Sequence, residues 1–187
     1  MLGQSVARWL HEAVEVLRAV DGHSLTRAAE VLLEVRGRGG VIYTAGNGGS
    51  ASTASHLALD LQKAGRPSHR AGTRAVCLTD NPGLITAWAN DTAFERVFAE
   101  QFEVLARPGD GVVVISVSGS SPNVVALLEA AKKKRVASVG LLGRDGGKAA
   151  QMVDAGVVVP SNDYGWVEAV HVVLNHVLTY VMRDATA

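Results

Sequence analysis

Apolar side chains recur every three or four residues at the start of the chain, which predicts an amphipathic helix. The positions are Val6, Trp9, Leu10, Val14, Leu17 and Val20. A polar run at 21–24 interrupts the pattern, and we expect Ser24 to be the N-cap of a second helix that ends at the glycine-rich run 37–40. Residues 4–36 are therefore predicted to form two helices.

After residue 40, short apolar runs alternate with helical segments. The runs predict strands at 41–45, 75–78, 112–117, 136–142 and 155–160. Helices are predicted at 50–64, 82–105 (in two pieces divided near Asn90 and Asp91), 122–134, 146–152 and 164–184. Strands that are apolar throughout are typical of a sheet covered on both faces. We therefore expect an α/β fold with a doubly wound five-stranded parallel sheet flanked by helices, an N-terminal helical hairpin and a long C-terminal helix.

Length and composition fit one globular domain. Of the 187 residues, 48% are hydrophobic and 19% are charged, so the chain can bury a core and lacks the composition of a disordered protein. We expect a single domain over 1–187, with the N-terminal helices in 1–38 and the α/β core with the C-terminal helix in 39–187.

Charge and cysteine content exclude several functional classes. The chain has 18 Lys and Arg residues and 18 Asp and Glu residues, which argues against nucleic acid or a membrane surface as a partner attracted by net charge. The one cysteine, Cys77, excludes an internal disulfide framework and a cysteine-rich zinc module. No apolar run reaches the roughly 18 residues of a membrane span, and the N-terminus lacks a signal-peptide core. We expect a cytoplasmic protein.

Two loops of small and hydroxylated residues follow predicted strands and open predicted helices. They are GNGGS at 46–50 and SVSGSSPN at 116–123. Small residues let backbone N–H groups approach an anion, hydroxyls add donors, and a helix N-terminus adds positive charge. Neither loop is a Walker A or dinucleotide motif, so no nucleotide cofactor is expected. Each loop alone is also typical of ordinary turns, but two at equivalent strand ends favour a phosphate site.

Histidines and carboxylates occur on two predicted helices among apolar neighbours. His56 and Asp60 are four residues apart and share a helix face, and the last helix carries Glu168, His171 and His176. A single histidine in such a setting more often packs in a core. Two helices that each carry a histidine and a carboxylate instead suggest a site for Zn²⁺ or a similar ion, or for proton transfer.

Helical spacing leaves the ligand set open on the last helix. Glu168 and His176 are eight residues apart, which is about 12 Å of rise and about 80° of rotation on an ideal helix. The helical wheel alone would pair Glu168 with His171 or Asn175.

Several segments together resemble the sugar isomerase (SIS) domain family, and within it the sedoheptulose 7-phosphate isomerases, also called phosphoheptose isomerases. They are GNGGSASTASHLALDL at 46–61, Asn90 and Asp91, SVSGSSPNV at 116–124, LLGRDGGK at 141–148 and EAVHVVLNH at 168–176. The resemblance implies a flavodoxin-like sheet and a homotetramer with active sites between subunits. It also implies conversion of sedoheptulose 7-phosphate to D-glycero-D-manno-heptose 7-phosphate through an enediol intermediate, with one Zn²⁺ per subunit.

The resemblance also implies roles for individual residues. Contacts to the sugar or its phosphate fall on Asn47, Gly48, Gly49, Ser50, Asp91, Ser116, Ser118 and Ser121. The metal ligands are His56, Asp60, Glu168 and His176. Asp60 is the implied base and His176 the implied acid, and Glu168 is an alternative base.

Several positions depart from the family pattern. The family usually has Glu at the position of Asp60 and Gln at that of Glu168. Gly165 and Trp166 replace a polar pair, and Val117 replaces a hydroxyl residue. Two alternatives therefore stay open: an isomerase of another sugar phosphate, and a non-catalytic SIS tetramer that binds a protein such as the replication initiator.

Overall fold

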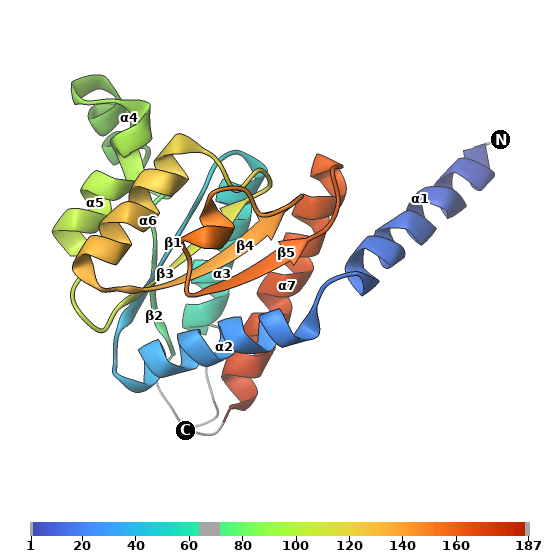
Figure 1. Cartoon of the computed structure of the whole chain (residues 1–187), viewed down its shortest axis with the longest axis horizontal. Helices are drawn as coiled ribbons and strands as arrows, with labels where there is room; N and C mark the ends of the chain where they lie inside the picture. The colour runs from blue at the N-terminus through green and yellow to red at the C-terminus, as the bar shows by residue number, and fades with distance from the viewer. Residues whose placement is uncertain (1, 64–71, 186–187) are drawn as a thin grey trace.

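The computed structural model describes residues 2–63 and 72–185, and within them five parallel strands form one sheet (Figure 1). The strands are β1 (Val41–Gly46), β2 (Arg74–Cys77), β3 (Gly111–Ser116), β4 (Ala137–Gly143) and β5 (Ala155–Val159), in the spatial order β2-β1-β3-β4-β5. All five predicted strands are confirmed, each to within one residue at either end.

Helices connect the strands and precede the sheet. The α-helices are α1 (Leu2–Arg18), α2 (Gly22–Gly37), α3 (Gly49–Lys63), α4 (Pro82–Asp91), α5 (Val97–Leu105), α6 (Pro122–Lys134) and α7 (Tyr164–Asp184). Short 3₁₀ turns, η1 and η2, span Phe94–Arg96 and Ala149–Gln151. The predicted bounds of α6 and α7 are confirmed, and so is the division of 82–105 after Asp91. None of the described helices has the length and apolar character of a membrane span.

Two local predictions are wrong. The N-cap of α2 is Asp21, whose carboxylate accepts from the backbone N–H groups of His23 and Ser24, while the Ser24 hydroxyl donates to the same carboxylate. A charged acceptor takes the orphan N–H groups ahead of a hydroxyl. The helix predicted at 146–152 is only η2, because Gly146 and Gly147 adopt φ values of +82° and +53°, outside the helical region.

The sheet is covered on both faces, as a doubly wound fold requires. Along β3 the side chains alternate: Val113 and Ile115 join the core under α2, α3 and α7, and Val112 and Val114 join the core under α5 and α6. Figure 1 shows these two helical layers on opposite sides of the sheet. This arrangement explains why the strands are apolar throughout.

The order of the strands brings two loops together at the carboxyl ends of β1 and β3. β1 and β3 are neighbours, and Gly46 at the end of β1 pairs in register with Ile115 near the end of β3. The chain leaves β1 into α3 on one face and leaves β3 into α6 on the other. In open α/β sheets the crevice beyond this strand-order reversal is where ligands bind.

Helix α6 ends on a non-glycine residue in the left-handed conformation, Arg135 (φ 57°, ψ 42°). In the folded state, an L-residue in this conformation costs about 1–2 kcal/mol more than glycine. Glycine offsets part of this difference, because it gives the unfolded chain more conformational entropy. We predict that Arg135→Gly raises the free energy of unfolding by about 0.5–1 kcal/mol. Urea unfolding at fixed protein concentration measures the effect. Lys134→Gly, inside the last helical turn, should lower stability instead, and a destabilised Arg135→Gly would contradict the argument.

Candidate active site and metal-binding group

A cavity of about 170 Å³ lies at the carboxyl ends of β1 and β3. Its lining consists of Asn47, Ser50, Ile115, Ser116, Val117, Ser118, Ser121, Tyr164 and Glu168. Three segments that are far apart in the sequence therefore meet here: the loop after β1, the loop after β3 and the first turns of α7. The structure brings together six of the side chains that the sequence predicted for substrate or metal binding.

Hydrogen bonds between and within the two loops define the cavity. The amides of Asn47 and Asn123 exchange two hydrogen bonds of 2.8 and 2.9 Å, which tie one loop to the other. The Ser116 hydroxyl accepts from the backbone N–H of Gly119 at 3.1 Å. Asn123 was not among the predicted site residues. The sequence showed only its place at the start of a predicted helix, because its burial and its partner Asn47 are tertiary features.

Close packing requires glycine at one position of the first loop and brings a second glycine against Glu168. A Cβ atom on Gly46 would lie 2.6 Å from the backbone oxygen of Ser50, so only glycine lets α3 begin directly against the strand end. A Cβ atom on Gly49 would overlap the carboxylate of Glu168. Glu168 thus faces the first turn of α3, where a helix N-terminus favours negative charge. Gly48 between them has φ +55°.

A second group of polar side chains lies between α3 and α7. His56 Nε2 and His176 Nδ1 each lie 3.3 Å from the same atom, Oδ2 of Asp60. Asp60 is buried, whereas the side chains of the two histidines are 40% and 41% exposed. Potential ligand atoms of all three residues lie within 4.8 Å of one another.

This donor set suits a divalent cation. Two imidazoles and one carboxylate are ligands that Zn²⁺ takes in catalytic sites, where a further position is left for water or substrate. The fourth predicted ligand, Glu168, is placed in the serine-lined cavity and is not part of the three-residue group. On α7 it is His176 that joins this group, because its imidazole faces Asp60 across the helix contact.

Comparison with known proteins places these residues in context. Residues 8–143 match the SIS domain. The chain is 37% identical over 179 residues to the phosphoheptose isomerase of Geotalea daltonii, covering 94% of this chain and 92% of that protein. It is 37% identical over 186 residues to that of Roseiflexus sp., covering 96% and 94%. The solved structure of phosphoheptose isomerase GmhA from Neisseria gonorrhoeae matches with a TM-score of 0.91 at 31% identity, covering 99% of this chain and 100% of that chain.

The chain belongs to the SIS domain family, in its phosphoheptose isomerase branch. Within this SIS domain, one predicted contact residue lies apart from the cavity. Asp91 ends α4, is exposed, and accepts a hydrogen bond from its neighbour Asn90. Its predicted role in substrate binding stays a prediction.

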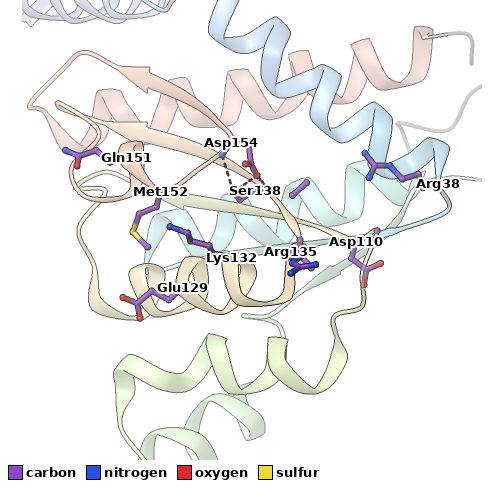
Figure 2. Close-up of a pocket in the computed structure, with 12 residues that line it drawn as sticks. Arg38, Asp110, Glu129, Lys132, Arg135, Ser138, Gln151, Met152 and Asp154 are labelled. Carbon is purple, nitrogen blue, oxygen red and sulfur yellow. Dashed lines mark hydrogen bonds between the residues drawn. The ribbon is translucent and has the colours of Figure 1, made fainter.

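A roomier cleft, of about 640 Å³, lies at the amino ends of the strands, opposite the first cavity (Figure 2). None of the predicted site residues lines it. Two of its acids, buried Asp110 and exposed Asp154, have structural partners. Asp154 accepts from the backbone and hydroxyl of Ser138, and Asp110 accepts from the backbone N–H groups of Val41 and Arg107. These contacts secure the starts of β1 and β4, so the cleft gathers structural rather than catalytic groups.

His171 occupies the core of the SIS domain. Its side chain is fully buried, and neither ring nitrogen has a hydrogen-bond partner among the described residues. Burial disfavours the charged form and lowers its pKa to about 4, although the nearby backbone of Leu142 acts in the opposite direction. His171 is therefore a neutral core residue.

The low pKa of His171 predicts a pH dependence of stability. The ordinary histidine value is 6.5, so the unfolded chain binds a proton between pH 6.5 and 4 that the folded chain does not. Stability should fall as pH decreases through this window, by roughly 3 kcal/mol from this group. Urea unfolding between pH 7 and 4 should show a smaller loss for His171→Leu than for wild type. Thr179→Val, another buried position on α7, should keep the wild-type slope, and equal slopes for all three proteins would contradict the assignment.

Proposed function

We propose that this SIS-domain protein is an aldose–ketose isomerase that converts sedoheptulose 7-phosphate to D-glycero-D-manno-heptose 7-phosphate. The observation that carries the proposal is a serine-lined cavity beside a His-Asp-His group. Helices α3 and α7 hold the three residues of the group and also contribute Ser50 and Glu168 to the cavity. Relatives named phosphoheptose isomerase at 37% identity support this substrate. The site's position beyond the strand ends, at the reversal of strand order, also fits a small ligand.

The phosphate is proposed to bind between the two loops. Ser116, Ser118 and Ser121 supply hydroxyls, and α3 and α6 begin beside the cavity with N–H groups free of intrahelical partners. Asn47, Gly48, Gly49 and Ser50 contribute contacts from the first loop. Because the formal charge of the chain is zero, these local donors rather than a bulk field must recognise the anion. Phosphate binding remote from the reacting carbons then positions the sugar for reaction.

The reaction transfers protons without net oxidation or reduction. Asp60 removes the proton from the carbon beside the ketose carbonyl, and His176 donates a proton to the carbonyl oxygen, which gives the enediol. Return of the proton to the former carbonyl carbon, with loss of the hydroxyl proton from its neighbour, gives the aldose. Glu168 is the alternative base, since its carboxylate lies in the cavity itself.

A divalent cation, best Zn²⁺, is proposed to be held by His56, Asp60 and His176, with Glu168 as the fourth ligand. When bound, it stabilises negative charge that develops on the substrate oxygen. Two carboxylates among four ligands would favour a dication more than one carboxylate does.

The protein is also proposed to act in the cytoplasm as a homotetramer. Helix α1 has no buried residue and projects away from the sheet (Figure 1). Its exposed apolar side chains are Leu2, Val6, Trp9, Leu10, Val14 and Leu17. A helix with an unburied apolar stripe gains stability by packing against another copy of the chain.

Activity with sedoheptulose 7-phosphate is the direct test. Metal-loaded protein should form the aldose, and removal of the metal by a chelator should abolish turnover. Asp60→Asn and His176→Gln should each lower kcat/KM by about 10²–10⁴-fold, the usual contribution of acid–base groups. Glu168→Gln tests the alternative base: a loss of about 10²–10⁴-fold with Zn²⁺ still bound would place Glu168 in the proton transfer, and near-wild-type activity would leave that role to Asp60.

Other outcomes distinguish the alternatives. Turnover only with five- or six-carbon sugar phosphates would replace the substrate and keep the reaction class. No turnover of any sugar phosphate, together with specific capture of a replication initiator by metal-free protein, would identify a non-catalytic adaptor instead.

The tetramer makes a separate prediction. Leu10→Glu combined with Val14→Glu places charges one turn apart on the apolar stripe of α1, so the assembly should dissociate. Sedimentation or light scattering should show about four copies of the 19.5 kDa chain for wild type and fewer for the variant. Val104→Glu, at an apolar residue of α5 that is 78% exposed, is the matched control and should remain tetrameric.

A further inference from the structure

Asn175 is a buried amide at the contact of α3 and α7. It has no exposed surface, and its Nδ2 donates a hydrogen bond of 3.3 Å to Oδ2 of Asp60. Its Oδ1 has no hydrogen-bond partner among the residues that the structure describes. The amide is therefore half-satisfied, with its only described hydrogen bond directed at the candidate metal ligand.

Core stability does not account for this residue. A buried acceptor without a partner costs about 1–3 kcal/mol. The buried positions near it on α7 include apolar Leu174 and Leu178 as well as polar His171 and Thr179, and leucine at position 175 would remove that cost. An asparagine there must be explained by the hydrogen bond that it makes.

The hydrogen bond converges on an atom that two other groups already contact. His56 Nε2, His176 Nδ1 and Asn175 Nδ2 each lie 3.3 Å from Oδ2 of Asp60. The two imidazoles are themselves potential ligands, whereas an amide N–H can only donate. Asn175 is thus the contact that remains available to orient Asp60 when both imidazoles turn to a metal ion.

We propose that Asn175 is a positioning residue that orients the Asp60 carboxylate and thereby raises the affinity of the His56–Asp60–His176 group for a divalent cation. The inference rests on the metal site proposed above. Hydrogen bonds to ligating side chains fix their orientation, and their loss typically lowers metal affinity by 10–100-fold. Because the side chain of Asp60 is short, a small rotation moves both of its oxygens. The orientation of this carboxylate therefore depends on such a contact.

The test compares Asn175→Leu with Thr179→Val in the full-length protein. Thr179 is also fully buried on α7, but its hydroxyl makes no hydrogen bond to Asp60 or to any other described residue. Competition with a chromophoric chelator measures Zn²⁺ affinity, and thermal unfolding without metal measures the fold. Asn175→Leu should bind Zn²⁺ 10–100-fold more weakly, and Thr179→Val should stay within about twofold of wild type.

Melting without metal separates positioning from a structural role. Neither variant should melt far below wild type, because each removes an unsatisfied buried atom, and in Asn175→Leu this gain offsets the lost hydrogen bond to Asp60. Asn175→Ser, which is too short to reach Asp60, should show the same loss of affinity if Asn175→Leu does not fold. Wild-type affinity in both Asn175 variants would overturn the inference while leaving the metal site intact. Failure of wild-type protein itself to bind Zn²⁺ would overturn the metal site and the inference together.

Discussion

The packing of α3 against α7 is the contact on which the candidate site depends. Gly49 meets Glu168 at the beginning of these helices, and Asp60 meets Asn175 and His176 further along. α3 is placed by β1, since only glycine at 46 lets the helix begin against the strand end. A change in the spacing of the two helices would therefore disturb the cavity between the two loops and the candidate metal ligands together.

Helix α7 buries several polar side chains, whereas the core of a protein is usually apolar. Along α7, His171, Asn175 and Thr179 are fully buried, and each has at least one side-chain atom that lacks a partner among the described residues. Such groups lower stability. Proteins keep violations of this kind mainly where chemistry requires them, and two of the three lie close in sequence to His176. For Asn175 the hydrogen bond to Asp60 supplies a reason, whereas nothing in the structure explains Thr179.

Local signals along the chain made most of the fold predictable from the sequence. Pro122 marks the start of α6 and the run of buried apolar residues marks β3, because each reflects a local steric or burial constraint. Competition between nearby groups was harder to predict: Asp21 rather than Ser24 caps α2. The pairing of His176 with Asp60 could not follow from a helical wheel, which carries no information about where a partner helix lies. Asn175 was seen only as a possible neighbour of Glu168, and its contact with Asp60 is a tertiary feature.

The dimensions of the site connect the chemistry to assembly. Ligand pockets usually measure about 300–1,000 Å³ and enclose most of their ligand. The cavity that Glu168 lines measures about 170 Å³ in one chain, and His56 and His176 remain 40% and 41% exposed. A sugar phosphate bound there by a single chain would stay largely in water, where charge stabilisation is weak. The apolar stripe of α1 lies near this exposed site. Its Trp9 ring is 6.1 Å from the ring of Trp166, which stands two residues before Glu168. Copies of the chain that pack on this stripe would enclose the same end of α7, so burial of α1 and exclusion of water from the site would be one event.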